Sequence, residues 1–424
     1  GRIDHHNVQI LCATTVFYLS LLPGRRWLLG AMAGAMTALC LVVGLEMLPC
    51  LAVIWGMMVL RHAFAEEGVD QWLIGFCLAF AVAAPVLLAG QTPMSGWWVN
   101  HCDVLAPPLL GLAAIGIVAS LVPVVLARAL PYSAARIGVS LAITGGGLWL
   151  AAPLLLPCLA GPYAGATPEV RMIIESRINE ALSAHILWNI RPELLLRILM
   201  PPAVIGLLAL GATWLWRGRI QRPLGIALIQ SFVVLGVGFA FALIQIRAAN
   251  LMTPALPLLA GFLVHAFTAI PRDHRLRAPA ALILMLAIPA VLESAARLIG
   301  GPPEMPVLAA DSDPASVIAA SVSIAFCRNE AAMAEIATLP TSVVFSSGNL
   351  GPAILVYTPH SITSAGYHRS AAAFHNGTVA FDSRDLLQQA LASSRADYLV
   401  ICLGLAEERF IDSLSTDGWP DWLV

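Results

Sequence analysis

Residues that could hold a metal ion stand together at the start of the chain. Residues 1–6 read GRIDHH, so Asp4, His5 and His6 directly precede an apolar stretch that runs from Val8 to Leu22. In a soluble protein such a trio is more often a helix cap and two solvated side chains. At the edge of a hydrocarbon layer ionisable groups are costly and usually functional. Because Asp and neutral His are ligands for Mn²⁺, Mg²⁺ and Zn²⁺, these residues predict a divalent-metal site.

The composition sets the class of protein that must position this cluster. Of 424 residues 59% are hydrophobic and 11% are charged, and the mean hydropathy is +0.82. These values indicate a polytopic α-helical membrane protein. The chain contains no Lys and no basic stripe, so nucleic acid is not an expected partner. It begins on Gly1 without a charged leader, which predicts a fragment or a processed product.

About ten apolar stretches have lengths close to what a helix needs to cross a bilayer. They lie at about residues 7–22, 27–44, 49–61, 71–90, 106–127, 137–158, 197–216, 223–245, 251–269 and 279–297. Every second connection carries arginines that the positive-inside rule makes cytoplasmic, namely Arg25, Arg26, Arg61, Arg128, Arg136, Arg217, Arg219, Arg222, Arg272, Arg275 and Arg277. The opposite face then collects residues 1–6, the turn at Glu46, the loops 91–105 and 159–196, the turn at Arg247 and everything after residue 300. We expect a bacterial inner membrane location with this face in the periplasm.

Two features of the outer face have both a structural and a functional interpretation. The long loop 159–196 carries Glu175 and Glu180, which are either the solvated face of an interfacial helix or carboxylates that position an acceptor or complete a metal site. Arg247 stands alone between two apolar stretches. It is either a snorkelling interfacial side chain or a phosphate clamp, because a guanidinium pairs with two phosphate oxygens at once.

The composition after residue 300 is that of a soluble domain, and we expect a small periplasmic α/β domain over 300–424. Strand-like runs lie at 342–346 and 397–403, and helical stretches lie at 314–337, 384–394 and 405–413. Tyr367, His368 and Arg369 form either a surface cluster or a contact to an anionic ligand.

The eight cysteines fall into two groups. Four lie inside apolar stretches and are expected to act as small apolar residues, namely Cys12, Cys40, Cys50 and Cys77. Cys327 and Cys402 are expected to form a disulfide in an oxidising periplasm. Cys102 and Cys158 form a second possible pair.

The sequence resembles the catalytic subunits of oligosaccharyltransferases, in particular the single-subunit archaeal and bacterial enzymes of the GT-C class. Residues 1–6 look like the family's metal motif in its Asp-His-His form, which makes Asp4 and His6 the metal ligands. Ile178-Asn179-Glu180 looks like the end of the T-I-x-E motif, and Arg247 is similar to the Arg that faces the donor pyrophosphate. The ten stretches fit a chain that lacks the family's first three helices.

The resemblance implies a metal-dependent, inverting glycosyltransferase. It would move a sugar or oligosaccharide from a polyprenyl-(pyro)phosphate donor in the membrane lipid to an acceptor polypeptide or glycan, with Mn²⁺ or Mg²⁺ as cofactor. Asp4 and Glu180 would be the catalytic residues. The residues expected to bind substrate are His5, Arg247, Tyr367, His368 and Arg369.

Two family motifs are not found in these residues. The first acidic motif would lie upstream of Gly1, so the fragment alone is expected to be inactive. The acceptor-recognition motif W-W-D-Y-G has no counterpart, since the Trp419–Trp422 segment reads W-P-D-W. The type of acceptor therefore stays open.

Two other functions remain open. In a transporter or flippase, Asp4, His5 and His6 would form a proton relay, and discontinuous helices would be expected. In a non-catalytic relative, an assembly or sensor protein, the metal site would have decayed.

Overall fold

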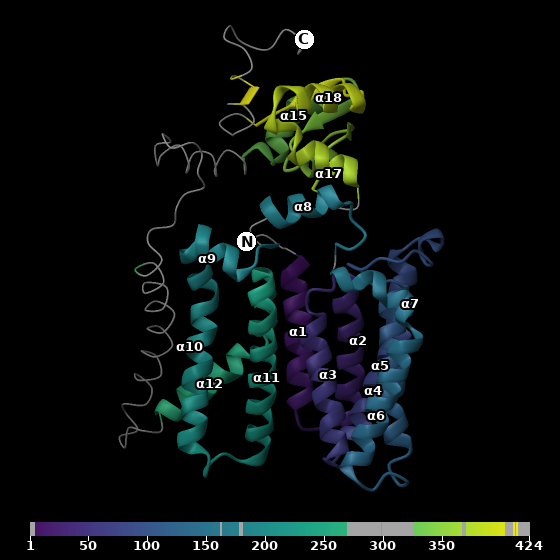
Figure 1. The fold of residues 1–424 in the computed structure, drawn as a ribbon, viewed down its shortest axis with the longest axis vertical. Helices are drawn as coiled ribbons and strands as arrows, with labels where there is room; N and C mark the ends of the chain where they lie inside the picture. Colours follow the sequence, from purple (N-terminus) through teal and green to yellow (C-terminus); the bar gives the residue numbers. More distant parts are fainter. Residues whose placement is uncertain are drawn as a thin grey trace. The chain divides into compact units, whose positions relative to one another are not determined.

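The computed structural model describes residues 5–161, 163–177, 181–268, 298, 326–366, 370–402, 410, 411 and 413 (Figure 1). The chain divides into two compact units. The first comprises Gly1–Gly165 and Ser176–Pro303, and the second comprises Ala166–Glu175 and Glu304–Val424. The division near residue 303 lies close to the expected domain boundary at 299. In addition, part of the long loop 159–196 groups with the second unit.

The first unit opens with a group of helices that run alongside one another. They are α1 (His5–Leu21), α2 (Arg26–Val43), α3 (Leu48–Ala63), α4 (Val69–Gln91), α5 (Pro107–Val125) and α6 (Ser133–Leu150), with the short η1 (Met94–Gly96) before α5. Proline occupies the first turn of α3 and of α5. Backbone N–H groups in the first turn have no partner within the helix, so the missing N–H of proline costs no hydrogen bond there.

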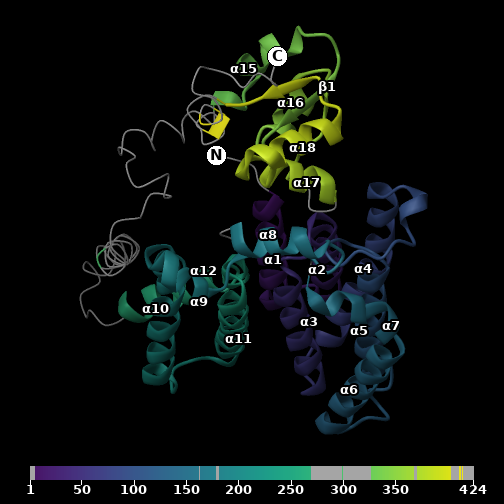
Figure 2. The same ribbon diagram turned by 45° about the horizontal axis from the view of Figure 1, so that its top comes forward.

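A second group of helices completes the first unit. It consists of α7 (Ala152–Leu155), η2 (Leu156–Ala160), α9 (Ala184–Ile190), α10 (Pro192–Trp216), α11 (Arg222–Ile244), η4 (Ile246–Met252) and α12 (Leu256–Thr268). Helix α10 packs against α12, and α11 packs against both of them and against α3. Figures 1 and 2 accordingly show α11 between α10 and the first group. The Gln230 side chain of α11 donates a hydrogen bond to Ser20 Oγ of α1 over 2.7 Å, so the two groups are tied together.

The described part of the chain is a polytopic helical membrane protein. Helices α2, α4, α5, α10 and α11 are long and apolar enough to cross a membrane, and two bent pairs raise the number from five to seven. Only 22% of the apolar window of α10 is buried inside the protein although its mean hydropathy is 2.0, so its outer surface requires a hydrocarbon solvent. Nine of the ten expected stretches overlap a described helix. Two of the nine, at 7–22 and 49–61, match α1 and α3, which have 17 and 16 residues and are not among these candidate spans. The tenth, 279–297, lies outside the described residues, and a total of ten spans stays a prediction.

Glycines allow α2 and α4 to pack at very short range. A Cβ on Gly30 would lie 2.0 Å from the Trp72 carbonyl oxygen, and one on Gly34 would lie 2.3 Å from that of Phe76. On α4, a Cβ on Gly75 would lie 2.1 Å from the Trp27 oxygen. Small residues four apart are the usual way for membrane helices to bring their backbones together. This contact fixes the frame on which α1 and α3 are assembled.

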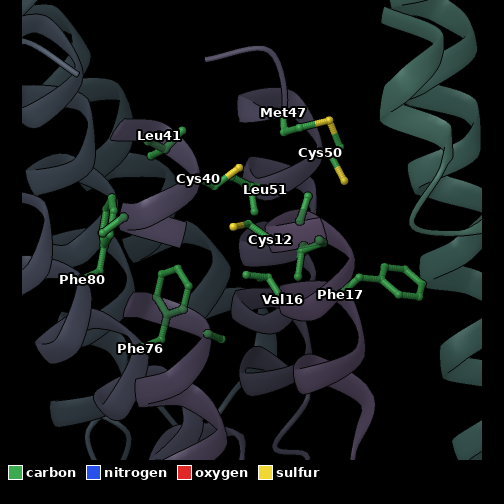
Figure 3. Close-up of a cluster of buried hydrophobic side chains, with 14 of the residues drawn as sticks. Cys12, Val16, Phe17, Cys40, Leu41, Met47, Cys50, Leu51, Phe76 and Phe80 are labelled. Atoms are coloured by element: carbon green, nitrogen blue, oxygen red, sulfur yellow. The ribbon is translucent and has the colours of Figure 1, made fainter. Parts of the chain in front are cut away.

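The core of the first group is apolar and contains the four free cysteines. Cys12, Cys40, Cys50 and Cys77 are all buried and unbridged, as predicted from the sequence. Figure 3 shows the first three of them among apolar side chains, with Val16 close to Cys12. They pack as small apolar residues rather than as reactive thiols.

The C-terminal end of α1 is held by donors from two other helices. Arg61 of α3 donates to the Ser20 carbonyl oxygen over 2.9 Å, and the Trp72 indole of α4 donates to the Leu19 oxygen over 3.2 Å. Arg61 also makes a two-pronged pair with Glu66, at 2.8 and 2.5 Å. The last carbonyl groups of a helix lack partners within it, so these donors satisfy groups that would otherwise be buried unpaired. The hydrogen bonds from Arg61 hold the pKa of Glu66 below its ordinary value.

We expect Arg61→Gln, a substitution in the last turn of α3, to destabilise the folded protein strongly. The change leaves Glu66 partly buried without its cation and removes a donor from the end of α1, a loss of about 3 kcal/mol. Thermal unfolding in detergent measures it, with Arg128→Gln as the control because Arg128 is exposed in a neighbouring connection. Because the Glu66 pKa is lowered in the folded state, the stabilisation is present above its unfolded value and is lost as the pH falls through the folded one. Equal melting temperatures for the two variants would contradict this role.

The second unit contains a three-stranded parallel sheet in the order β2-β1-β3. Its strands are β1 (Val343–Ser346), β2 (Ser361–Ile362) and β3 (Tyr398–Val400). Its helices are α8 (Pro168–Arg177), α15 (Glu330–Ala337), α16 (Gly351–Tyr357), α17 (Ala371–Thr378) and α18 (Arg384–Ser394), with η5 (Ala380–Asp382) before α18. Val344 packs with Met333 and Ile354 on one face, and Phe345 packs with Leu387 on the other. Neighbouring strand residues point to opposite faces, so β1 is the middle of a three-layer α/β arrangement.

The sequence predicted several of these elements correctly. The strand-like runs at 342–346 and 397–403 contain β1 and β3, and the helix at 384–394 is α18. Of the helix expected at 314–337, residues 326–337 are described, and a turn at 328–329 precedes α15. Of the stretch at 405–413, only residues 410, 411 and 413 are described, and all three are helical. Strand β2 and helices α16 and α17 were not expected, because their sequences are too short for a clear periodicity.

Two disulfides are formed. Cys327 and Cys402 are bridged with their Cα atoms 5.9 Å apart, which confirms the expected pair. Cys102 and Cys158 are also bridged, at 5.2 Å, so the second possible pair is present as well. Both separations are ordinary for disulfides. The first bridge joins the segment before α15 to the residues after β3, and the second joins the loop before α5 to the segment after α7.

Candidate metal centre

The first turn of α1 carries the two histidines of the N-terminal motif. His5 begins the helix and is exposed, whereas the side chain of His6 is 15% exposed. One turn further on, Gln9 is buried at 1% exposure and lies against Gly44, whose hypothetical Cβ would be 2.6 Å from the Gln9 amide nitrogen. The close contact at Gly44 brings the turn between α2 and α3 onto the first turn of α1.

This turn places Glu46 beside the histidines. Helix α2 ends before Gly44, and the buried Met47 precedes α3, so the carboxylate of Glu46 stands between two anchored residues. Glu46 Oε2 contacts His6 Nδ1, and its side chain is 32% exposed. A carboxylate and an imidazole from two separate segments thus share one small, partly buried space.

Arg247 reaches the same space from the other helix group. It lies in η4, whose first residue Ile246 is buried and donates its backbone N–H to the Leu182 oxygen over 2.9 Å. Arg247 Nη2 is 2.6 Å from Glu46 Oε1 and 3.2 Å from His6 Nδ1, and it also contacts the second ring nitrogen of His6. The guanidinium is therefore held at the mouth of the bundle by a partly buried ion pair.

Tyr163 adds a phenol to this group. Burial raises its pKa above the ordinary value, and the negative charges of Glu46 and Asp103 act in the same direction, while the charge of Arg247 and a hydrogen bond with it act against them. The phenol is consequently protonated at neutral pH and can donate a hydrogen bond. The Cys102–Cys158 disulfide joins the loop that contains Asp103 to the segment that precedes Tyr163.

The side chains fit a divalent metal ion. The potential ligand atoms of His5, His6 and Glu46 all lie within 4.8 Å of one another. Metal–ligand bonds of about 2.1 Å allow two ligands of one ion to be at most about 4.2 Å apart, so small side-chain rotations suffice. Two imidazole nitrogens and one carboxylate oxygen form a donor set that Mn²⁺, Fe²⁺ and Zn²⁺ all accept. Asp4, the preceding residue in the sequence, lies outside the described residues.

The structure brings together three of the residues that the sequence singled out. His6 and Arg247, which are 241 residues apart, are in contact, and His5 is next to them. His5 was expected to bind substrate rather than metal, and its ring nitrogen is placed for either role. Glu180, Tyr367, His368 and Arg369 lie outside the described residues together with Asp4, so their roles stay predictions.

Sequence reasoning missed Glu46 and Tyr163 as members of the site. A signal for Glu46 was present, because it is a lone carboxylate between two apolar stretches on the face that also carries His6 and Arg247. No comparable signal in the sequence marked Tyr163. No known family, curated protein or solved structure matches this chain.

Proposed function

We propose that this protein is a metal-dependent membrane glycosyltransferase of the oligosaccharyltransferase type. It transfers a sugar or oligosaccharide from a polyprenyl-(pyro)phosphate donor to an acceptor polypeptide or glycan. The observation that carries the proposal is the meeting of His6, Glu46 and Arg247 at one end of the helix bundle. A metal-ligand set beside a guanidinium is the chemistry that a pyrophosphate leaving group requires.

In this proposal the metal is held by Asp4 and His6, and Glu46 or His5 supplies a further ligand. A bound Mn²⁺ or Mg²⁺ ion would provide a Lewis acid beside the negative charge of the leaving pyrophosphate. The partly buried position of His6, 15% exposed, strengthens electrostatic interactions relative to open water.

Arg247 and Tyr163 bind the donor phosphates in this mechanism. The guanidinium has five N–H donors, of which Nη2 contacts Glu46, so its other donors can pair with a phosphate oxygen. The Tyr163 phenol, kept protonated by burial, donates a hydrogen bond to another oxygen. The Arg247 and Tyr163 side chains thereby orient the sugar-bearing substrate for in-line attack.

Glu180 is the proposed acceptor-binding carboxylate and is ranked above Glu175. It orients the acceptor nucleophile for attack at the anomeric carbon, and the attack inverts the configuration there. Holding donor and acceptor in one geometry supplies much of the rate enhancement. Tyr367, His368 and Arg369 would contact an anionic part of the substrate.

The proposed location is a bacterial inner membrane with the metal centre and the second unit in the periplasm. Support comes from two independent features. The arginine-bearing connections predict the opposite face to be cytoplasmic. Both disulfides lie in segments assigned to the outer face, where an oxidising environment allows them to persist.

One observation favours a second function, transport or flipping of a substrate. The pair Ser133–Leu150 and Ala152–Leu159 is bent by 67°, and the pair Ile246–Met252 and Leu256–Thr268 is bent by 55°. Broken helices near a polar site are typical of transporters. The second break lies between Met252 and Leu256, at the end of the 3-10 helix η4 that carries Arg247, so this residue would then belong to a substrate pathway.

A donor-cleavage assay separates these functions. The full-length protein is incubated with a polyprenyl-pyrophosphate-linked oligosaccharide and candidate acceptors, and the released polyprenyl phosphate species is measured by mass spectrometry. We expect release that requires Mn²⁺, is abolished by EDTA and returns when excess Mn²⁺ is added. Movement of the intact donor across proteoliposomes without cleavage would instead establish the transporter. If the protein neither cleaves the donor nor binds metal, it is a non-catalytic relative.

A further inference from the structure

A cavity of about 690 Å³ lies at the end of the first unit opposite the metal centre. The 17 residues of α1 separate the two sites by about 25 Å, since a helix rises 1.5 Å per residue. The cavity is bounded by the end of α1, the connection after α3 and the beginnings of α2, α4 and α11. It therefore shares no residue with the proposed catalytic site.

Three arginines line this cavity, namely Arg26, Arg61 and Arg222. Arg61 is committed to Glu66 through the two-pronged pair. Arg222 is exposed and its side chain makes no hydrogen bond to any other residue that the structure describes. Arg26 donates from Nη1 to the Leu22 carbonyl oxygen over 3.1 Å, so its other N–H groups and those of Arg222 remain to face a ligand. Glu66 and Glu67 also line the cavity, so the three arginines leave one positive charge in excess.

The backbone adds to the positive potential and orients one of the arginines. Helices α2, α4 and α11 begin at the cavity, whereas α1 and α3 end there, so three positive helix ends face it against two negative ones. Gly68, which precedes α4, lies so close to Arg26 that a Cβ there would be 2.8 Å from the Arg26 Cγ. The glycine lets the stem of Arg26 pass along the backbone toward the cavity.

Apolar side chains complete the wall. Leu21, Pro223 and Ile226 line the cavity, and the nearby Leu22 and Trp27 are 46% and 58% exposed. Exposed Trp at the end of membrane helices typically marks the level of the lipid headgroups. A ligand at this position has a polar group among the arginines and an apolar part against the helix ends.

We propose that this cavity binds a phosphate group, supplied by the headgroup of an anionic membrane phospholipid or by a free phosphate compound. The arginines and helix N-termini recognise the phosphate in either case, since guanidinium groups and backbone N–H groups are the usual phosphate ligands. The lipid source accounts for the apolar wall as well. Neither ligand takes part in the proposed glycosyl transfer.

Native mass spectrometry of the detergent-solubilised full-length protein tests the proposal. The probes are dioleoylphosphatidylglycerol, which carries a phosphate, and dioleoylglycerol, which does not. We expect Arg26→Gln/Arg222→Gln to weaken phosphatidylglycerol binding at least about tenfold, because each lost charge-assisted contact is worth a factor of that size. The control Arg25→Gln/Arg128→Gln removes the same charge from exposed positions that do not line the cavity, and it should change binding less than about twofold.

Two outcomes support a phosphate site. Displacement of the lipid by inorganic phosphate assigns the site to free phosphate, and resistance to displacement assigns it to the lipid. Equal loss in the two double variants, no loss in either, or equally tight binding of dioleoylglycerol would overturn it. If the cavity variant does not fold, Arg222→Gln alone gives the same comparison with Arg25→Gln, because both side chains are exposed.

Discussion

His6→Ala in the full-length protein is expected to weaken Mn²⁺ binding by about a hundredfold or more and to abolish metal-dependent transfer. Of the two predicted metal ligands, Asp4 and His6, the structure describes His6. Its imidazole contacts both Glu46 and Arg247. Its loss removes one ligand and the contact that aligns the carboxylate. Mn²⁺ affinity is measured by the loss of the free-ion electron paramagnetic resonance signal, which does not depend on turnover.

His5→Ala and His185→Ala provide the comparison for this prediction. His5 belongs to the cluster, so a loss of Mn²⁺ affinity comparable to that of His6→Ala would make it a ligand. A defect in transfer alone would give it the substrate-binding role that the family resemblance implies. His185 is exposed on α9 and is not part of the cluster, and its replacement should change neither quantity. Undiminished Mn²⁺ binding in His6→Ala would refute the metal centre.

The membrane helices could be predicted well because their signal is local. Hydropathy placed a stretch at 71–90 where α4 runs from Val69 to Gln91, and one at 223–245 where α11 runs from Arg222 to Ile244. Pro85 lies inside α4 and does not end it. A proline that would break an exposed soluble helix is tolerated here because neighbouring helices compensate for the lost hydrogen bond.

The bends could not be predicted from hydropathy. The stretch at 137–158 was expected as one helix, but the structure divides it, with a bend of 67° between α6 and the segment Ala152–Leu159. Residues Pro153 and Pro157 follow the break, so a local signal was present. Apolar composition continues across both sides of the bend and therefore conceals it.

The sequence predicted on which side of the membrane the site lies, but not which residues form it. Alternation of arginine-bearing connections put His6, Glu46 and Arg247 on the same side of the membrane. Which of them would touch depends on lateral packing, since α11 must lie against α1 and α3 for Arg247 to reach His6. That arrangement rests on contacts such as the Gln230–Ser20 hydrogen bond, between residues 210 positions apart, which a single sequence does not reveal.

Arg247→Lys is expected to raise the donor KM and to lower kcat, with a combined loss in kcat/KM of about ten- to a hundredfold. Lysine keeps the positive charge, but it presents one nitrogen where the guanidinium offers a planar fork that can pair with two oxygens. The loss of one charge-assisted hydrogen bond corresponds to this range. The ion pair with Glu46 at 2.6 Å would be weakened as well, although both side chains are 22–32% exposed and the effect on stability should be small.

Arg191→Lys is the matched control for this substitution. Arg191 precedes α10 on the same predicted face and is not among the residues that contact the metal centre. Its replacement should leave KM and kcat within about twofold of the parent protein, because no phosphate-binding fork is lost. Mn²⁺ affinity should be unchanged in Arg247→Lys, since Arg247 offers no metal ligand. Parent-like kinetics in Arg247→Lys would mean that this arginine is a snorkelling side chain, and a matching defect in Arg191→Lys would attribute the effect to general loss of arginine near the membrane surface.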